Sequence, residues 1–414
     1  MDGLHVVANL YRCGGEVHYL TDAEPLRRFC IDSVERAGLT VVGELFHQFE
    51  GGGVTGCVVL AESHLAIHTW PELGSVTLDV YVCNYTTVND AKARQVVDEL
   101  YALFKPADHV RHDVPRDRQF LYEWLNEDYG FFLRADKRLG AARTKFQDLE
   151  IYNTPQFGKL FRLDGCFMTS ERDEFFYHEN LIHPAATAHK APKRALIIGG
   201  GDGGAAEELL KHPSIERVVM VEIDGKVVDI AKEHFGKIHR DAFSDRRLEL
   251  KITDGLAYLA ATDERFDLIA LDLPDPIGPA TALYETAFFA NCRRALAPGG
   301  ALTLHMGSPV SRPDRVAAIY ERLAATFPIV RPFVVFIPLY GALWSLACCS
   351  DSLDPSALGP AEIEQRIAAR RLSQLQYYNG ATHQAVFALP NFVRELTVTR
   401  APVNLLESKR RATA

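Results

Sequence analysis

The strongest constraint in this chain is a run of glycines and one acid, Gly199–Gly204, between a predicted strand and a predicted helix. The run has the form G-x-G-x-x-G, which lets a backbone approach a bound nucleotide closely. Apolar strand patterns alternate with helical patterns around it, and this alternation predicts a doubly wound, Rossmann-like α/β domain. The predicted strands are 194–198, 217–223, 248–252, 267–272 and 301–306, with later ones near 329–336 and 344–349.

Acidic residues in and after this loop favour one class of ligand. Asp202 stands where the phosphates of a dinucleotide would lie, and a carboxylate there repels pyrophosphate but suits a nucleoside that carries a cation. Glu222 ends the next strand, where an acid can hydrogen-bond ribose hydroxyls. Asp254 follows the third strand and could accept a hydrogen bond from an adenine amino group. The pattern favours an S-adenosylmethionine-type ligand in a methyltransferase-type fold, and a dehydrogenase loop stays the alternative.

Two further carboxylates, Asp272 and Asp275, follow the fourth strand. Ligands of parallel sheets bind at the carboxyl ends of the strands. Two carboxylates at that place can hold a diamine and accept its proton. A solvated acidic loop is the alternative interpretation.

The rest of the chain divides at changes of pattern. Residues 1–105 combine strand-like runs with amphipathic helices at 22–38 and 89–104, which predicts an α+β two-layer domain. The polar stretch 106–118, with two prolines, is interpreted as a linker. A small β segment, 119–192, leads into the α/β domain of residues 193–414.

Composition excludes several classes of function. The net charge is −9, which argues against binding to nucleic acid. No run of about 18 apolar residues indicates a membrane span, and the N-terminal residues do not have the form of a secretory signal. Eight cysteines in 414 residues are too few for a disulfide scaffold. We therefore expect a cytoplasmic protein, with no nucleic-acid or membrane partner.

Motifs of the second half closely resemble spermidine synthases, the polyamine aminopropyltransferases, over about residues 120–400. The combination is specific although each motif alone is weak. The motifs include Gln147, 163–165, 171–179, 199–204, 221–224, 254–255, 272–279, 338–340, Trp344, 377–379 and 387–390.

The resemblance implies a role for each matching residue. Glu222 would hold the ribose and Asp254 the adenine. Asp202 and Gln147 would hold the aminopropyl tail of decarboxylated S-adenosylmethionine. Asp272 would be the base that frees the attacking amine. The diamine end of the site would be lined by Tyr177, His178, Asp275 and Tyr340.

The implied reaction is a displacement at the carbon next to the sulfonium, which gives spermidine from putrescine and releases methylthioadenosine. The protein would supply mainly alignment and one deprotonation. Leu273 and Pro274 stand where the family usually carries small hydroxyl residues, and Met168 stands where it usually carries glutamine. The family's Gln/Glu pattern on the fifth strand is replaced around His305. These departures leave the amine acceptor open.

A second cluster of polar residues spans residues 62–72 in the first half. His64 and His68 are four apart, but their flanks are strand-like and a third ligand is not signalled, so we predict no metal site. By themselves these residues could equally be ordinary polar positions of a strand. Together with 46–49, 53–56 and Cys83 they closely resemble prokaryotic S-adenosylmethionine decarboxylases over about residues 3–105.

That resemblance implies self-cleavage and a cofactor made from the chain itself. The Ser63 hydroxyl would attack the Glu62 carbonyl, and residue 63 would become a covalent pyruvoyl group that serves as the electron sink for loss of CO₂. By the same resemblance His68 would assist processing and Cys83 would protonate the carbanion. The nucleoside would be contacted by Phe49 and Glu72.

Strand alternation places Ser63 and His68 on opposite faces, so a bend or bulge is expected near them.

The two halves together predict a bifunctional enzyme of polyamine biosynthesis, and by analogy a homo-oligomer of at least two copies. Three alternatives stay open. Glu50 could favour ornithine or arginine as the decarboxylase substrate. The second half could be a plain methyltransferase, or one half a non-catalytic partner.

Overall fold

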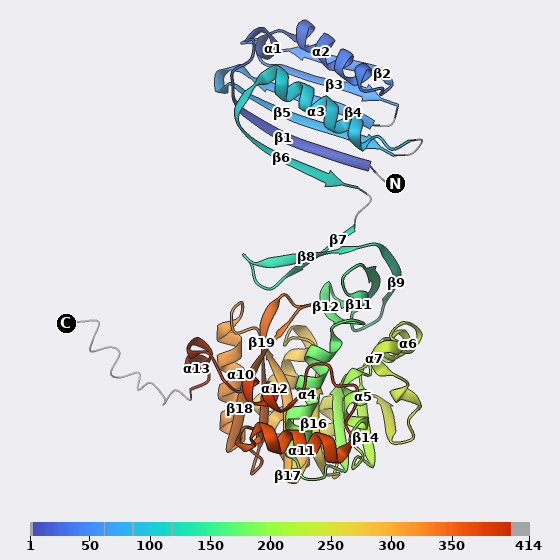
Figure 1. Cartoon of the computed structure of the whole chain (residues 1–414), viewed down its shortest axis with the longest axis vertical. Coiled ribbons are helices and arrows are strands. Elements are labelled where there is room, and N and C mark those ends of the chain that lie inside the picture. Colours follow the sequence, from blue (N-terminus) through green and yellow to red (C-terminus); the bar gives the residue numbers. More distant parts are fainter. Residues whose placement is uncertain (1–2, 62, 85–86, 117–118, 399–414) are drawn as a thin grey trace, which may run out of the picture. The chain divides into compact units, whose positions relative to one another are not determined.

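The structure is a computed structural model that describes residues 3–61, 63–84, 87–116 and 119–398. The chain forms two compact units, Met1–Gln119 and Phe120–Ala414. Figure 1 shows both, coloured along the sequence. Each unit has its own sheets and its own hydrophobic core.

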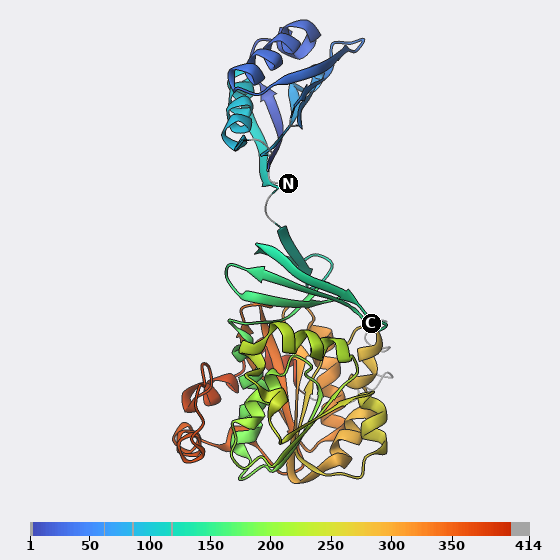
Figure 2. The same cartoon turned by 90° about the vertical axis from the view of Figure 1, so that its right-hand side faces the viewer.

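The first unit is an antiparallel sheet whose helices lie on one face (Figure 2). Its described residues form six strands in the order β2-β3-β4-β5-β1-β6. Alternate residues of the four inner strands, β1, β3, β4 and β5, are buried; in β5 these are Val76, Leu78, Val80 and Val82. The predicted α+β two-layer architecture is therefore confirmed. The elements are β1 Gly3–Cys13, α1 His18–Thr21, α2 Ala23–Arg36, β2 Val41–Gln48, β3 Val54–Leu60, β4 Ser63–Trp70, η1 Pro71–Leu73, β5 Ser75–Cys83, α3 Asp90–Phe104 and β6 Pro106–Pro115.

Helix α2 is capped by Asp22, the residue at which the predicted helix 22–38 begins. The Asp22 carboxylate accepts a hydrogen bond from the backbone N–H of Glu24 at 3.1 Å, which satisfies a donor that the first helical turn leaves unpaired. Leu26, Cys30 and Val34 recur at helical spacing and are fully buried. The helix thus packs on the sheet through the stripe that its sequence predicts.

The stretch that the sequence indicates as a linker is largely a strand. Residues 106–115 form β6, which pairs antiparallel with β1 from Leu4 to Cys13. β6 lies at the edge of the sheet, and its two prolines stand at its ends, where a missing N–H is tolerated. His109 and His112 are exposed, so the polar composition reflects an edge strand rather than a loop.

The second unit begins with two small sheets. In the described residues β7 pairs with β8, and β9 to β12 form a sheet in the order β12-β11-β10-β9. The strands are β7 Gln119–Trp124, β8 Gly130–Ala135, β9 Lys137–Arg143, β10 Asp148–Thr154, β11 Gly158–Leu163 and β12 Cys166–Ser170.

A seven-stranded sheet follows in the described chain, with the order β15-β14-β13-β16-β17-β19-β18. Its first five strands are parallel, and β19 pairs antiparallel with both β17 and β18. Helices cover both faces (Figure 2), which confirms the doubly wound α/β fold. The strands are β13 Arg194–Gly199, β14 Arg217–Glu222, β15 Leu248–Ile252, β16 Phe266–Asp272, β17 Leu296–Gly307, β18 Ile329–Ile337 and β19 Ala342–Ser350.

Helices and 3-10 turns connect and extend these strands. The direction of the strand order reverses between β13 and β16, and this switch point is where such folds bind their ligands. The helices are α4 Glu174–Ala188, α5 Gly204–Leu210, α6 Gly225–His234, α7 Gly236–His239, α8 Gly255–Ala261, α9 Thr286–Ala295, α10 Pro313–Thr326, α11 Pro360–Arg370, α12 Gly380–Val386 and α13 Asn391–Leu396. The 3-10 turns are η2 Ala242–Ser244, η3 Gly278–Tyr284 and η4 Pro355–Ala357.

The glycine loop joins β13 to α5 at this switch point. Gly199, Gly200 and Gly203 have φ of 82°, 71° and 85°, values that residues with a Cβ rarely adopt. Gly204 is needed for a different reason, because a Cβ there would overlap the imidazole ring of His178. The loop therefore brings α5 against α4 more closely than other residues allow.

We predict that Gly204→Ala destabilises the second unit by about 1–3 kcal/mol, because the added methyl group must displace a buried ring. Thermal unfolding of the purified chain measures the effect. Gly236→Ala is the matched control, since no described atom lies within 4 Å of a Cβ at that position. Equal melting temperatures for the two variants would contradict the prediction.

Candidate active sites

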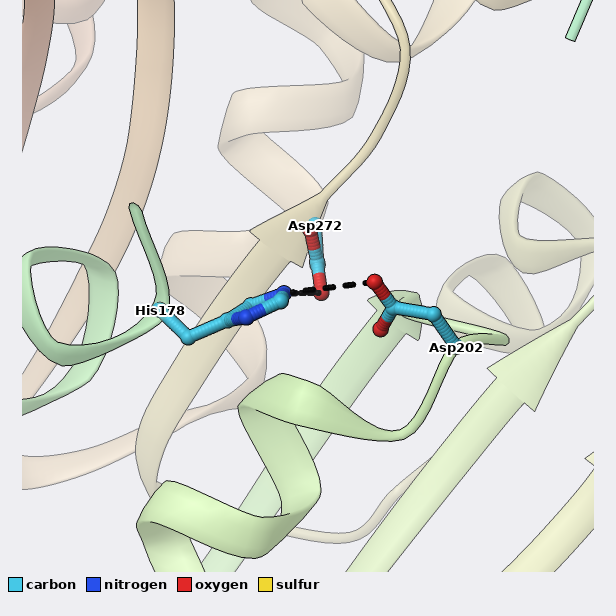
Figure 3. Close-up of side chains that lie close together, drawn as sticks. All are labelled: His178, Asp202 and Asp272. Carbon is cyan, nitrogen blue, oxygen red and sulfur yellow. Dashed lines mark ion pairs between the residues drawn. The ribbon is translucent and has the colours of Figure 1, made fainter. Parts of the chain in front are cut away.

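Three polar side chains meet at the carboxyl edge of the large sheet, each delivered by a different element. Asp202 comes from the glycine loop, Asp272 ends β16, and His178 projects from α4. Nε2 of His178 lies 3.4 Å from Oδ2 of Asp202 and 3.9 Å from Oδ2 of Asp272. Figure 3 shows the imidazole pointing at both carboxylates. The structure therefore brings together three residues that the sequence predicted at this site.

Burial and mutual charge shift the pKa of all three groups. Burial, together with the neighbouring Asp202 carboxylate, raises the pKa of Asp272 to about 7. Burial alone would lower the pKa of His178, but Asp202 and the hydrogen-bonded Glu174 raise it well above its usual value. The imidazolium in turn overcomes burial and lowers the pKa of Asp202. The cluster thus holds one firmly ionised carboxylate and one that titrates near neutral pH.

Glu174 orients the histidine, a role that the sequence interpretation did not assign. Its Oε2 lies 2.9 Å from Nδ1 of His178 inside α4, and both side chains are buried. The four-residue spacing on one helix was the available signal. The contact fixes the ring so that Nε2 faces the two aspartates.

Aromatic side chains enclose the same site. Tyr177 and Tyr340 lie with ring centroids 6.2 Å apart, and the Tyr340 hydroxyl donates to the backbone oxygen of Met168 at 2.9 Å. The Tyr177 hydroxyl and Oδ2 of Asp272 are both buried, and each group influences the pKa of the other. The aromatic rings and the carboxylate therefore belong to one buried polar site.

The residues predicted to bind the nucleoside follow the neighbouring strands. Glu222 ends β14 and is buried; its Oε1 accepts a hydrogen bond from the backbone N–H of Asp224 at 2.9 Å. Burial raises the pKa of Glu222 to about 7. Asp254 caps α8 by accepting from the N–H of Leu256 at 2.8 Å. Both acids lie at the strand ends where the sequence placed them.

Gln147 and Asp275 have partners that the sequence did not indicate. Nε2 of Gln147 donates to Oδ2 of Asp224 at 3.1 Å, so this amide is attached to the α6 cap. Asp275 forms an ion pair with Arg315 of α10. Its other oxygen, Oδ1, lies 4.0 Å from Nδ1 of His305, and both atoms are buried without a hydrogen bond in the described chain. Arg315 therefore neutralises part of the charge expected at the diamine end.

In the first unit, the register of the sheet brings Ser63 close to Cys83. Ser63 pairs with Val82, the residue next to Cys83, and Cys83 is buried. Ser63 has φ of 146°, a strained value for a residue with a Cβ. Its Oγ lies 3.5 Å from Nδ1 of His64. Glu62, the residue expected before the cleaved bond, lies outside the described residues.

The other predicted decarboxylase residues lie toward the opposite end of β4. Nδ1 of His68 contacts the hydroxyl of Thr55 at 2.6 Å. Five positions of extended strand separate His68 from Ser63, a span of about 16 Å. Phe49 is 51% exposed beyond β2, and Glu72 lies exposed in η1. A single chain therefore does not bring these three residues to Ser63.

None of the described helices is both long and apolar enough to cross a membrane.

Three family models match the chain. They are S-adenosylmethionine decarboxylase at residues 4–117, the spermidine synthase tetramerisation domain at 123–171, and the spermine/spermidine synthase domain at 174–356.

Curated relatives match the second unit over most of their own length. A polyamine aminopropyltransferase of Nitrosomonas europaea is 48% identical over 277 residues, covering 67% of this chain and 85% of the relative. Polyamine aminopropyltransferase 2 of Hyperthermus butylicus is 41% identical over 281 residues, covering 67% and 92%. A solved spermidine synthase from Thermotoga maritima has a TM-score of 0.63 and 32% identity, covering 69% of this chain and 96% of that structure.

A spermidine synthase solved in complex with the transition-state analogue AdoDATO gives a TM-score of 0.64 at 33% identity, with the same coverage. The chain belongs to the polyamine aminopropyltransferase family. Its first unit adds an S-adenosylmethionine decarboxylase domain, so the whole is a bifunctional enzyme of polyamine biosynthesis.

We predict that Glu222→Gln stabilises the chain at pH 8 but not at pH 4.5. The pKa of Glu222 is raised from 4.5 to about 7, so the folded chain keeps a proton that the unfolded chain has released between these values. Stability therefore falls as pH rises through this window, and above pH 7 the full penalty is present. Glutamine removes the penalty and keeps the acceptor oxygen, with an upper limit of about 3 kcal/mol.

Thermal unfolding at the two pH values measures this difference. The exposed Glu127→Gln is the control for loss of one negative charge. A melting temperature of the Glu222 variant that is equal to or below that of the parent at pH 8 would contradict the assignment.

Proposed function

We propose that the first unit decarboxylates S-adenosylmethionine with a pyruvoyl group formed from Ser63, and that the second unit transfers the aminopropyl group of the product to a diamine. Putrescine is the proposed acceptor, and spermidine and methylthioadenosine are the products. The observation that carries the transfer step is the cluster of His178, Asp202 and Asp272, in which the histidine is buried and the side chains of the two aspartates are only 14% and 11% exposed. Two acids beside one cation leave an overall negative site, which suits an amine.

Asp272 is the proposed base of the transfer reaction. Its pKa of about 7 lets it accept a proton from the attacking ammonium near neutral pH and release it afterwards. The freed amine then displaces the sulfonium at the adjacent carbon, because the sulfonium is already a good leaving group. Asp202 remains ionised beside His178 and is placed to hold the amine of the aminopropyl tail. Glu222 would hold the ribose.

The residues around Ser63 fit the proposed pyruvoyl group. Strain at Ser63 favours rearrangement of the peptide bond before it, and Cys83 is close enough in register to donate a proton to a product carbanion. The group, once formed, supplies the electron sink for loss of CO₂. The chain would then consist of residues 1–62 and 63–414.

We further propose that the decarboxylase site is completed by a second copy of the chain. Phe49, His68 and Glu72 lie away from Ser63 within one chain, and the match to a tetramerisation domain supports assembly of several copies. Exposed aromatic residues of β7 and β8 offer a surface for it. They are Tyr122, Trp124 and Phe132, each between 58% and 68% exposed.

The first experiment combines intact mass with product analysis. Under denaturing conditions we expect two chains that break before Ser63, the larger one beginning with a pyruvoyl group. Incubation with S-adenosylmethionine and putrescine should give CO₂, methylthioadenosine and spermidine. Release of CO₂ from ornithine or arginine instead would reassign the first unit. An uncut chain would remove the pyruvoyl proposal, and the transferase would then have to be tested with decarboxylated S-adenosylmethionine.

Asp272→Asn should lower the rate of aminopropyl transfer by about 10²- to 10⁴-fold, because the amide cannot accept the proton. Self-cleavage and decarboxylation should be unchanged, as measured in the same samples. Asp263→Asn, at an exposed position, is the matched control. Full transfer activity in the Asp272 variant would remove Asp272 as the base, and absence of transfer in the parent chain would support the alternative that the second unit is a non-catalytic partner.

Mixed assemblies test the shared decarboxylase site. Ser63→Ala cannot form the pyruvoyl group, and His68→Ala lacks the residue proposed to come from the second copy. If His68 acts across copies, coexpression of the two variants should restore cleavage of the His68→Ala chains, which contain Ser63. If cleavage remains as in His68→Ala alone, the histidine acts within its own chain or not at all.

A further inference from the structure

A row of polar side chains crosses three strands of the first unit beside Ser63. His5 of β1 and His64 of β4 both pair in register with Tyr81 of β5, so the three residues lie side by side across the sheet. Asp79, two residues before Tyr81, lies on the same face. Its Oδ1 lies 2.8 Å from Nε2 of His5 and 3.2 Å from Nε2 of His64.

Ser63 reaches this row because its backbone departs from an ordinary strand. Successive residues of a strand point to opposite faces, so Ser63 and His64 would normally point apart. The φ of 146° at Ser63 breaks that alternation and brings its Oγ to 3.5 Å from Nδ1 of His64. A base and nucleophile at this separation in an uncleaved chain can close to hydrogen-bond distance when the reaction proceeds.

The contacts of Asp79 select the tautomer of the neutral His64 ring. A carboxylate only accepts hydrogen bonds, so both histidines donate to it from Nε2. A neutral His64 then carries its proton on Nε2, and its Nδ1 is left as an acceptor that faces the Ser63 hydroxyl. This order of carboxylate, imidazole and hydroxyl is the arrangement that activates a serine nucleophile.

We propose that His64 is the base for self-cleavage at Ser63, and that Asp79, anchored by His5, is the residue that positions it. The inference rests on the proposed conversion of Ser63 to a pyruvoyl group. Oγ of Ser63 bonds to the carbonyl carbon of residue 62 while Nδ1 of His64 takes the hydroxyl proton. The bond from that carbon to the Ser63 nitrogen then breaks, and the nitrogen receives the same proton. The product is an ester with the atoms of the original peptide, and His64 is unchanged.

The test follows cleavage of the full chain during cell-free synthesis, so that uncut and cut forms are counted with time. His64→Ala should cleave at least 100-fold more slowly than the parent chain. The accumulated chain should resist hydroxylamine, which cuts esters but not amides, because the first step is blocked. His112→Ala, an exposed histidine of β6, should cleave at the parent rate.

Three results would overturn the role of His64. Cleavage of His64→Ala at the parent rate is one, and accumulation of a hydroxylamine-sensitive ester is another, because it would place His64 after the acyl shift. The third is failure of free imidazole to restore cleavage in His64→Gly. Imidazole can replace a missing base in a folded chain but cannot repair a misfolded one, so this failure would also count against His64 as the base. A parent chain that stays uncut would instead refute the proposed pyruvoyl function, which keeps the two failures distinct.

Asp79 is tested by the conservative change. Asp79→Asn can donate to the imidazole and reverse its tautomer, so cleavage should slow about 10-fold or more. Asp79→Glu keeps a group that only accepts and should retain most of the parent rate. Equal rates for the two variants would remove the positioning role. Melting temperatures of both variants in the Ser63→Ala chain, which stays uncut, control for folding.

Discussion

In the second unit, one buried positive ring lies beside two acids and controls the ionisation of both. Without the His178 imidazolium, Asp202 and Asp272 would each resist ionisation in the buried site. With it, Asp202 is ionised and Asp272 titrates near 7. The glycine loop, the start of α4 and the end of β16 all serve this arrangement, because each delivers one of the three groups to the same point.

The neutralisation of Asp275 by Arg315 distinguishes this site from what its motifs imply. A free aspartate at that place would add a full negative charge beside His305, whose ring packs against Tyr177. Burial raises the pKa of Glu123 to about 7, and the nearby Asp275 carboxylate makes a smaller contribution to this rise. The negative charge available to a distant ammonium is therefore smaller than a count of carboxylates indicates.

Local sequence signals predicted the fold well, and long-range contacts explain what they missed. Strand and helix periodicities and the cap at Asp22 reflect neighbours in the chain, and the structure follows them. β6 was interpreted as a linker because an edge strand with exposed polar residues resembles a loop. Arg315 reaches Asp275 from 40 residues away, a contact with no signature in its own stretch of sequence. The φ of Ser63, in contrast, agrees with the bend that strand alternation led us to expect near this residue.

The strand order of the first unit determines how the two fragments of the proposed cleavage would be held together. A break before Ser63 leaves β1, β2 and β3 on one fragment and β4, β5 and β6 on the other. β1 lies between β5 and β6, while β3 pairs with β4, so the fragments are interleaved rather than stacked. Two such fragments can separate only if the hydrogen bonds of three strand pairs, β3–β4, β1–β5 and β1–β6, are all broken. If the proposed cleavage takes place, the folded sheet holds the two fragments together, and a cut chain that unfolds becomes two molecules that must meet again before the sheet can re-form.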